Sequence, residues 1–228
     1  MRRTSLAGLL VVAASGGIQA HDPSTVPLTW NREISRLVYD KCASCHRPGG
    51  TSFSLMTYQD AQPRLTEIKE SVLARQMPPW GAVKGFGDFR NDQSLTQEQI
   101  ALVTDWVEGG GGRGGNRNVL PPVPKFETAA PFAAPANAIP VSGPATLKQA
   151  VVLDGMLPGR VPRGASMQIV ASLPDGSSQP LLWLYEYKDS LRHPFLFRKP
   201  VHLPAGTTIH GVPATARILL IPAPAPKS

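Results

Sequence analysis

The stretch Cys42-Ala43-Ser44-Cys45-His46 decides how this sequence is interpreted. Its pattern, C-x-x-C-H, is the attachment signature of a c-type haem. Two thiols separated by two residues can both add to the vinyl groups of one haem as thioethers. The adjacent histidine then lies against one face of the macrocycle, where it can bind the iron. Cys42, Cys45 and His46 are therefore the predicted haem-binding residues.

Two other interpretations of the cysteine pair are weaker. A thioredoxin-like redox pair requires a βαβ context, which the sequence around Cys42 lacks. Half a zinc site requires a second pair of Cys or His, and the nearest later histidine is the distant, unpaired His193. The chain has two cysteines in total. If both hold haem, none remains for a disulfide.

The first 20 residues have the layout of a secretory signal peptide. Arg2 and Arg3 precede an apolar run from Leu6 to Ala14, and small residues lead up to Ala20. The run is too short to span a bilayer, and an uncleaved anchor is the alternative. Because haem is normally attached after export, we expect a bacterial protein that is periplasmic or secreted.

Charge is distributed unevenly along the chain. Residues 21–112 contain nine Lys and Arg against eleven Asp and Glu, whereas residues 113–228 contain twelve against five. The basic residues of the second half are scattered along it, so nucleic-acid binding is not expected. That half is instead suited to peripheral contact with an acidic partner or an anionic membrane surface.

Three amphipathic helices are predicted around the motif. The first is capped by Asn31 and carries an apolar stripe that ends at the motif. The second begins at Thr57 or Gln62 and ends before Met77. The third follows the capping box Thr96-x-x-Gln99, and its Trp106 should pack against the first helix.

Met77-Pro78-Pro79-Trp80 follows the second predicted helix. A residue before proline is pushed out of helical geometry, so Met77 should present its thioether from an extended segment to the second face of the haem. A core role for Met77 is one alternative, and Met56, ten residues after His46, is the rival ligand. Trp80 and the aromatic loop from Phe86 to Phe89 are expected to pack on the haem, and ordinary core packing is the alternative.

This arrangement resembles the cytochrome c fold. It is most similar to bacterial cytochrome c domains that carry C-A-S-C-H-R-P-G-G, M-P-P-W and a final helix that opens with Leu-Thr and contains a tryptophan. Such domains often precede copper type II, ascorbate-dependent monooxygenase-like regions. The resemblance covers residues 29–112. It implies one covalent haem c on Cys42 and Cys45, with His46 and Met77 as the axial iron ligands.

The second half of the chain has a different pattern. Residues 113–145 are rich in Gly, Pro, Ala and Asn, which predicts an extended linker. From residue 146 onward, short β-type runs alternate with Gly and Pro. The predicted strands are residues 146–153, 166–173, 181–187, 195–200, 207–210 and 216–221. This spacing favours a small antiparallel β-sandwich or barrel.

Residues 193–207 also resemble a strand pair from the C-terminal domain of the copper monooxygenases. The copper site of that family uses a histidine pair, H-x-H, together with a methionine. His193, His202 and His210 are instead single residues at predicted strand edges. We therefore expect surface or hydrogen-bonded histidines, in a shortened relative that has lost the copper chemistry.

Together these patterns predict an α+β multidomain chain. Its expected parts are a signal peptide (1–20), an N-terminal all-α cytochrome c fold (21–112), a linker (113–145) and a β-sandwich (146–228). The expected function is an exported c-type cytochrome that passes one electron at a time to a redox partner protein. An electron carrier is favoured over an enzyme. The alternatives are an electron-feeding unit of a copper monooxygenase-like enzyme and a haem-based gas sensor.

Overall fold

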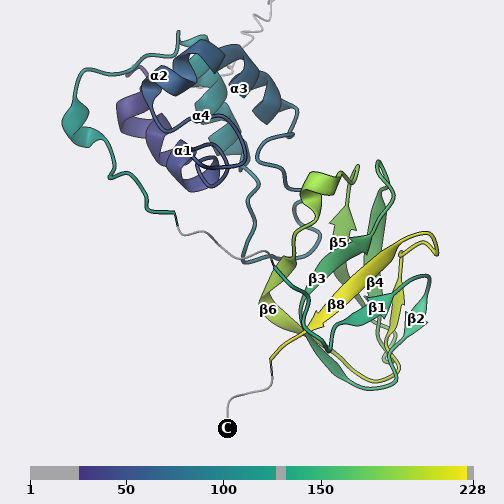
Figure 1. Ribbon diagram of the computed structural model, residues 1–228. Helices are drawn as coiled ribbons and strands as arrows, with labels where there is room; N and C mark the ends of the chain where they lie inside the picture. The colour runs from purple at the N-terminus through teal and green to yellow at the C-terminus, as the bar shows by residue number, and fades with distance from the viewer. Residues whose placement is uncertain (1–25, 127–131, 225–228) are drawn as a thin grey trace, which may run out of the picture.

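A computed structural model describes residues 26–126 and 132–224 of the 228-residue chain. The signal peptide predicted at residues 1–20, on which the expectation of export depends, lies outside the described residues. The helices gather at one end of the molecule and two β-sheets at the other (Figure 1). No helix in the described part of the chain is long and apolar enough to cross a membrane.

Short helices make up the first half of the chain. In order, they are a π-helical turn (Trp30–Ile34), α1 (Ser35–Lys41), α2 (Tyr58–Ala61), a 3-10 turn (Gln62–Arg64), α3 (Leu65–Leu73) and α4 (Gln97–Glu108). Capping boxes at Thr57 and Thr96 open α2 and α4, which confirms the predicted capping box at Thr96. Thr29, and not Asn31, caps the first turn. Asn31 is buried, and its side-chain amide donates to the Gly114 carbonyl over 2.8 Å.

Two small apolar clusters hold these helices together. The first contains Trp30, Ile34, Val38, Leu55, Ala61 and Trp106. In it, the rings of Trp30 and Trp106 lie 6.1 Å apart, so α4 does pack against the first helical turn. The second cluster contains Leu37, Val72, Leu95, Ile100 and Val103, and it joins α1 to α3 and α4.

The predicted fold class is wrong, because this half of the chain is not an all-α cytochrome c fold. The α-helices contain only 7, 4, 9 and 12 residues. Residues 78–90, here called the aromatic strap, leave the helices and join the β-sheets. Ala82 bridges to Leu184 and Phe89 bridges to Phe197. The strap cannot continue a helix after two prolines, and its Phe89 is buried among the apolar side chains of the sheets, with Trp80 partly buried against them.

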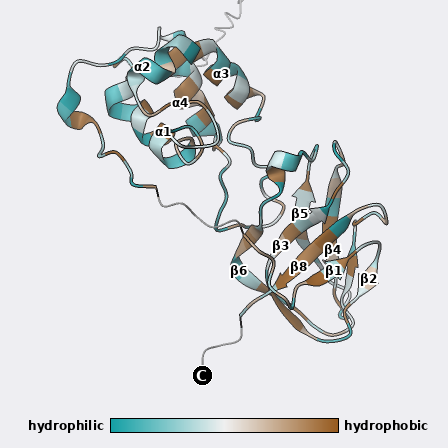
Figure 2. Ribbon diagram, viewed as in Figure 1, coloured by the Kyte–Doolittle hydropathy of each residue, from teal (hydrophilic) through white to brown (hydrophobic). Residues whose placement is uncertain are grey.

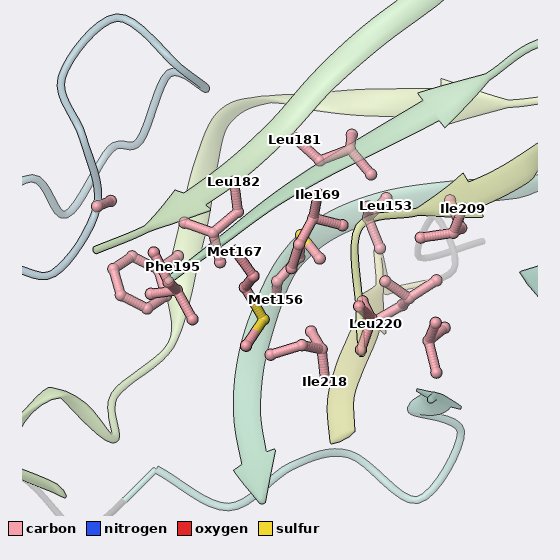
Figure 3. Close-up of a cluster of buried hydrophobic side chains, with 14 of the residues drawn as sticks. Leu153, Met156, Met167, Ile169, Leu181, Leu182, Phe195, Ile209, Ile218 and Leu220 are labelled. Carbon is pink, nitrogen blue, oxygen red and sulfur yellow. The ribbon is translucent and has the colours of Figure 1, made fainter. Parts of the chain in front are cut away.

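Two four-stranded antiparallel sheets form the second half. The strands are β1 (Ile139–Val141), β2 (Ala145–Thr146), β3 (Val151–Arg160), β4 (Met167–Ser172), β5 (Ser178–Leu184), β6 (Phe195–Leu203), β7 (Thr208–His210) and β8 (Arg217–Pro222). Their orders are β1-β8-β3-β6 and β2-β7-β4-β5. Apolar side chains from both sheets form one core, which Figure 2 shows as brown strands and Figure 3 in close-up.

Two details of the second half differ from the sequence-based prediction. Strand β1 lies inside the stretch predicted as linker, and its Pro140 is tolerated because β1 is an edge strand. Strand β3 runs through Pro158-Gly159, beyond the end of the strand predicted at residues 146–153. The register against β8 shifts between Pro158 and Arg160, so a bulge accommodates the Pro-Gly pair.

Candidate haem-binding site

The C-x-x-C-H motif forms the turn that follows α1. Cys42 is the C-cap of α1, and its backbone N–H donates to the Val38 carbonyl. His46 N–H then donates to the Cys42 carbonyl over 2.9 Å, which folds the motif back on itself. Cys42 and Cys45 are unbridged and partly buried. Two free thiols and a histidine are thus presented together by one turn.

The imidazole of His46 is held by a backbone carbonyl. His46 is 9% exposed, and its Nδ1 lies 3.0 Å from the carbonyl oxygen of Phe53. Because a carbonyl can only accept, Nδ1 carries the proton and the lone pair is on Nε2. Among the described residues, the one side-chain hydrogen bond of His46 is the bond through Nδ1. This is the usual arrangement of a metal-binding histidine, whose second nitrogen is fixed by an outer-shell acceptor.

The loop that carries Phe53 is itself well supported. The Leu55 N–H donates to the His46 carbonyl over 3.0 Å, which pairs the loop with the motif. The Phe53 ring lies edge-on to the His46 ring at 4.7 Å, and the Arg64 guanidinium lies 3.8 Å from the Phe53 centroid. Phe53 and Arg64 are functional candidates that sequence reasoning missed. Arg64 belongs to no recognisable sequence motif. A residue of any type at position 53 could supply the backbone carbonyl that accepts from His46.

The environment of Cys42 does not suit a redox-active thiol pair. Burial raises the pKa of the Cys42 thiol to about 12, and the nearby charges of Asp40 and Cys45 act in the same direction. Thiol–disulfide chemistry requires a thiolate near neutral pH, which reactive C-x-x-C pairs obtain by lowering the pKa. A Cys42 thiol with so high a pKa stays protonated near neutral pH, which argues against a thioredoxin-like role.

Met77 lies at the boundary between the helices and the sheets. Its side chain is 42% exposed, and it lines a hollow of about 720 Å³. Cys42, Cys45 and His46 are not among the residues that line this hollow. Its helical wall includes Val72, Leu95 and Ile100, which belong to the apolar cluster that Leu37 of α1 joins. Met77 therefore lines a hollow whose helical wall also packs against α1, and the motif follows α1.

The other methionines with described side chains lie in different surroundings. Met56 is partly buried, and its carbonyl accepts from the Tyr39 hydroxyl of α1 over 3.1 Å, so its loop lies beside the helix that ends at the motif and Met56 stays the rival ligand. Met156 and Met167 are 0% and 4% exposed and lie in the core between the sheets (Figure 3).

The aromatic residues expected on the haem pack elsewhere. The Trp80 ring lies 4.9 Å from Phe195, and the Phe89 ring stacks on Phe197 at 5.4 Å. Phe86 meets Trp183 edge-on at 5.8 Å. All three strap residues thus contact side chains of the β5 and β6 region, and their packing on haem stays a prediction. The sequence pattern shows apolar rings but not which partner they pack against.

The three histidines of the second half do not converge. His202 on β6 and His210 on β7 are exposed and belong to different sheets. His193 is partly buried, with its ring stacked on Trp80 at 5.0 Å. Within residues 26–126 and 132–224, no group of three or more His, Cys, Asp or Glu side chains could hold a metal ion.

The motif turn nevertheless has the donor set that a covalently bound haem requires. Cys42 and Cys45 supply the thiols, and His46 supplies a fixed Nε2 lone pair. The comparisons add no relative from which this role could be transferred. No family model, no curated protein and no solved structure matches the chain.

Proposed function

We propose that this chain is an exported c-type cytochrome that carries one electron at a time. Cys42 and Cys45 would hold one haem c covalently, with His46 as an axial iron ligand and Met77 as the second. The observation that supports this most is the hydrogen bond from His46 Nδ1 to the Phe53 carbonyl, beside two unbridged thiols. A C-x-x-C-H sequence alone does not require that arrangement.

The residues around His46 have separable roles. The Phe53 carbonyl fixes the tautomer and the direction of the imidazole, so Nε2 is always the free nitrogen. His46 as a whole is 9% exposed, so its ring is held within the turn. When bound, the haem would supply the one-electron chemistry of its iron, and a thioether ligand raises the reduction potential relative to harder ligands.

The assignment of Met77 rests on its accessibility. It is the methionine that lines the hollow beside α3 and α4, whereas Met156 and Met167 are buried in the β core. The basic second half suits an acidic partner or an anionic surface.

An optical spectrum of the purified protein, recorded in both redox states and after denaturation, tests the proposal. We expect haem that stays attached in denaturant, and a weak sulfur-to-iron charge-transfer band near the red end of the oxidised spectrum. Cys42→Ala combined with Cys45→Ala should abolish covalent haem, whereas Ser44→Ala, at an exposed position between them, should not. Haem that stays attached to the double variant through denaturation would contradict the assignment.

The same preparation separates the electron carrier from a gas sensor. Met77→Ala should remove the sulfur band and lower the reduction potential, whereas Met56→Ala should keep both. A wild-type protein that lacks the band and binds carbon monoxide rapidly when reduced would instead favour the sensor.

A further inference from the structure

The aromatic strap (residues 78–90) is hydrogen-bonded to both sheets. On the β5 side, the Val83 N–H donates to the Trp183 carbonyl over 2.9 Å, and the Tyr185 N–H donates to the Gly81 carbonyl over 3.0 Å. On the β6 side, Arg90 N–H donates to the Leu196 carbonyl over 2.8 Å. Strands β5 and β6 are the edge strands of the two sheets. The strap therefore lies across the open edges of both sheets on the same side.

Close packing holds the strap in this position. Gly87 has φ +92°, and a Cβ there would lie 2.5 Å from the Leu181 carbonyl oxygen and 2.6 Å from the Phe89 ring. Only glycine fits such a close approach with that backbone conformation. At the far end, Arg90 makes two hydrogen bonds to the Asp154 carboxylate, of 2.9 and 2.8 Å.

Trp80 anchors the near end of the strap. Its ring stacks on His193 at 5.0 Å with an interplanar angle of 17°. It also meets Phe195 edge-on at 4.9 Å and Phe89 at 5.9 Å. Three rings from the sheet side and the strap itself thus enclose the indole on several sides, as is favourable for aromatic packing.

Met77 is separated from this anchor by Pro78 and Pro79 alone. Proline fixes its own φ, so the two residues form a stiff spacer. On the other side, the Met77 N–H donates to the Ser71 carbonyl of α3 over 3.2 Å. The hollow beside Met77 is likewise built from both halves, with Val72 from α3 and Leu191 from the connection before β6. Met77 is therefore positioned from both the helices and the sheets.

We infer that the β-sheets position Met77 for the haem iron, through the packing of Trp80 against His193 and Phe195. This inference rests on the proposed function. It gives the second half of the chain a role in the redox site without any copper chemistry. His193 and Trp80 are positioning residues, because they act on the iron site through the strap and do not contact the reacting atoms.

The test compares His193→Leu with His193→Phe in the full-length haem protein. Leucine removes the ring that stacks on Trp80, whereas phenylalanine keeps an aromatic surface there. We expect His193→Leu to lose at least half of the sulfur-to-iron band, and to shift the Fe(II)/Fe(III) equilibrium about tenfold toward Fe(III), or roughly 59 mV. His193→Phe should keep most of the band.

Arg90→Gln provides a second variant that loosens the far end of the strap. Its side chain is 42% exposed, so its loss should leave the fold intact while it weakens the same band. Ile218→Val is the matched control: it removes a methyl group from the buried core of β8, away from the strap, and should leave the band unchanged.

The outcomes separate the inference from the proposed function. A wild-type protein without covalent haem, or without the sulfur band, contradicts the proposed function or its Met77 ligand. A wild-type protein with the band, and folded His193→Leu and Arg90→Gln variants that both keep the band and the potential, overturns the inference alone. An equal loss in Ile218→Val would also overturn it, because any destabilisation of the sheets would then suffice.

Discussion

Phe89→Ala tests whether the aromatic strap belongs to the β-sheets or to the haem. Phe89 is 4% exposed, stacks on Phe197 at 5.4 Å and meets Phe195 at 5.7 Å. Truncation of a buried phenylalanine to alanine removes apolar burial and leaves a cavity, at a cost of about 3–5 kcal/mol in the free energy of unfolding. For a domain of this size, that lowers the melting temperature by roughly 6–20 °C.

The assay is urea and thermal unfolding followed by circular dichroism, with Phe132→Ala as the control. Phe132 is 45% exposed, so its truncation should change the free energy of unfolding by less than about 0.5 kcal/mol. The comparison is then repeated in protein without haem, made by changing Cys42 and Cys45 to alanine. A ring packed on the sheets should cost the same with and without haem, because distant and independent effects add.

Two results would refute this reasoning. A cost below about 1 kcal/mol, close to that of Phe132→Ala, would mean that Phe89 is not packed in the sheet core. A large cost that disappears in the protein without haem would return Phe89 to the haem, as the sequence pattern suggested.

Three further predictions address other parts of the chain. Burial lowers the pKa of His193, so the folded protein favours the neutral ring. The free energy of unfolding should therefore fall as the pH drops from about 6.5 through the lowered pKa of His193. His193→Phe should flatten that dependence in urea titrations at pH 7.5 and 5. Asn31→Ala removes a buried amide that donates to loop carbonyls, so we expect a loss of about 1–3 kcal/mol in the same titrations. Gly211→Ala places a Cβ 1.7 Å from the Gln168 carbonyl and should greatly reduce the yield of folded protein, whereas Gly176→Ala, with the same positive φ but open space, should be milder.

Local signals in the sequence were sufficient for the start of α4, but not for the first helical turn, which Thr29 caps in place of Asn31. The Thr96 hydroxyl accepts a hydrogen bond from the Gln99 N–H, and the Gln99 side-chain oxygen accepts one from the Thr96 N–H. Four residues therefore specify the start of α4. Where the strap packs could not be predicted from local signals. Its partners on β5 and β6 lie about a hundred residues away, and no local pattern encodes a contact of that range. The predicted cytochrome c fold is therefore wrong at the aromatic strap, which lies between α3 and α4.

The candidate site likewise has a part that the sequence predicts and a part that it does not. Five consecutive residues carry the two thiols and the imidazole, so the chemistry of the motif can be recognised without the fold. The orientation of His46 depends on a carbonyl from Phe53, which the sequence does not distinguish from any other. Met77 depends on the path of the whole chain, because Ser71 holds it on one side and Trp80 on the other. A segment that the sequence assigned to the predicted haem domain alone is thus shared with the sheets, and Met77, the proposed second iron ligand, lies between the helices and the sheets.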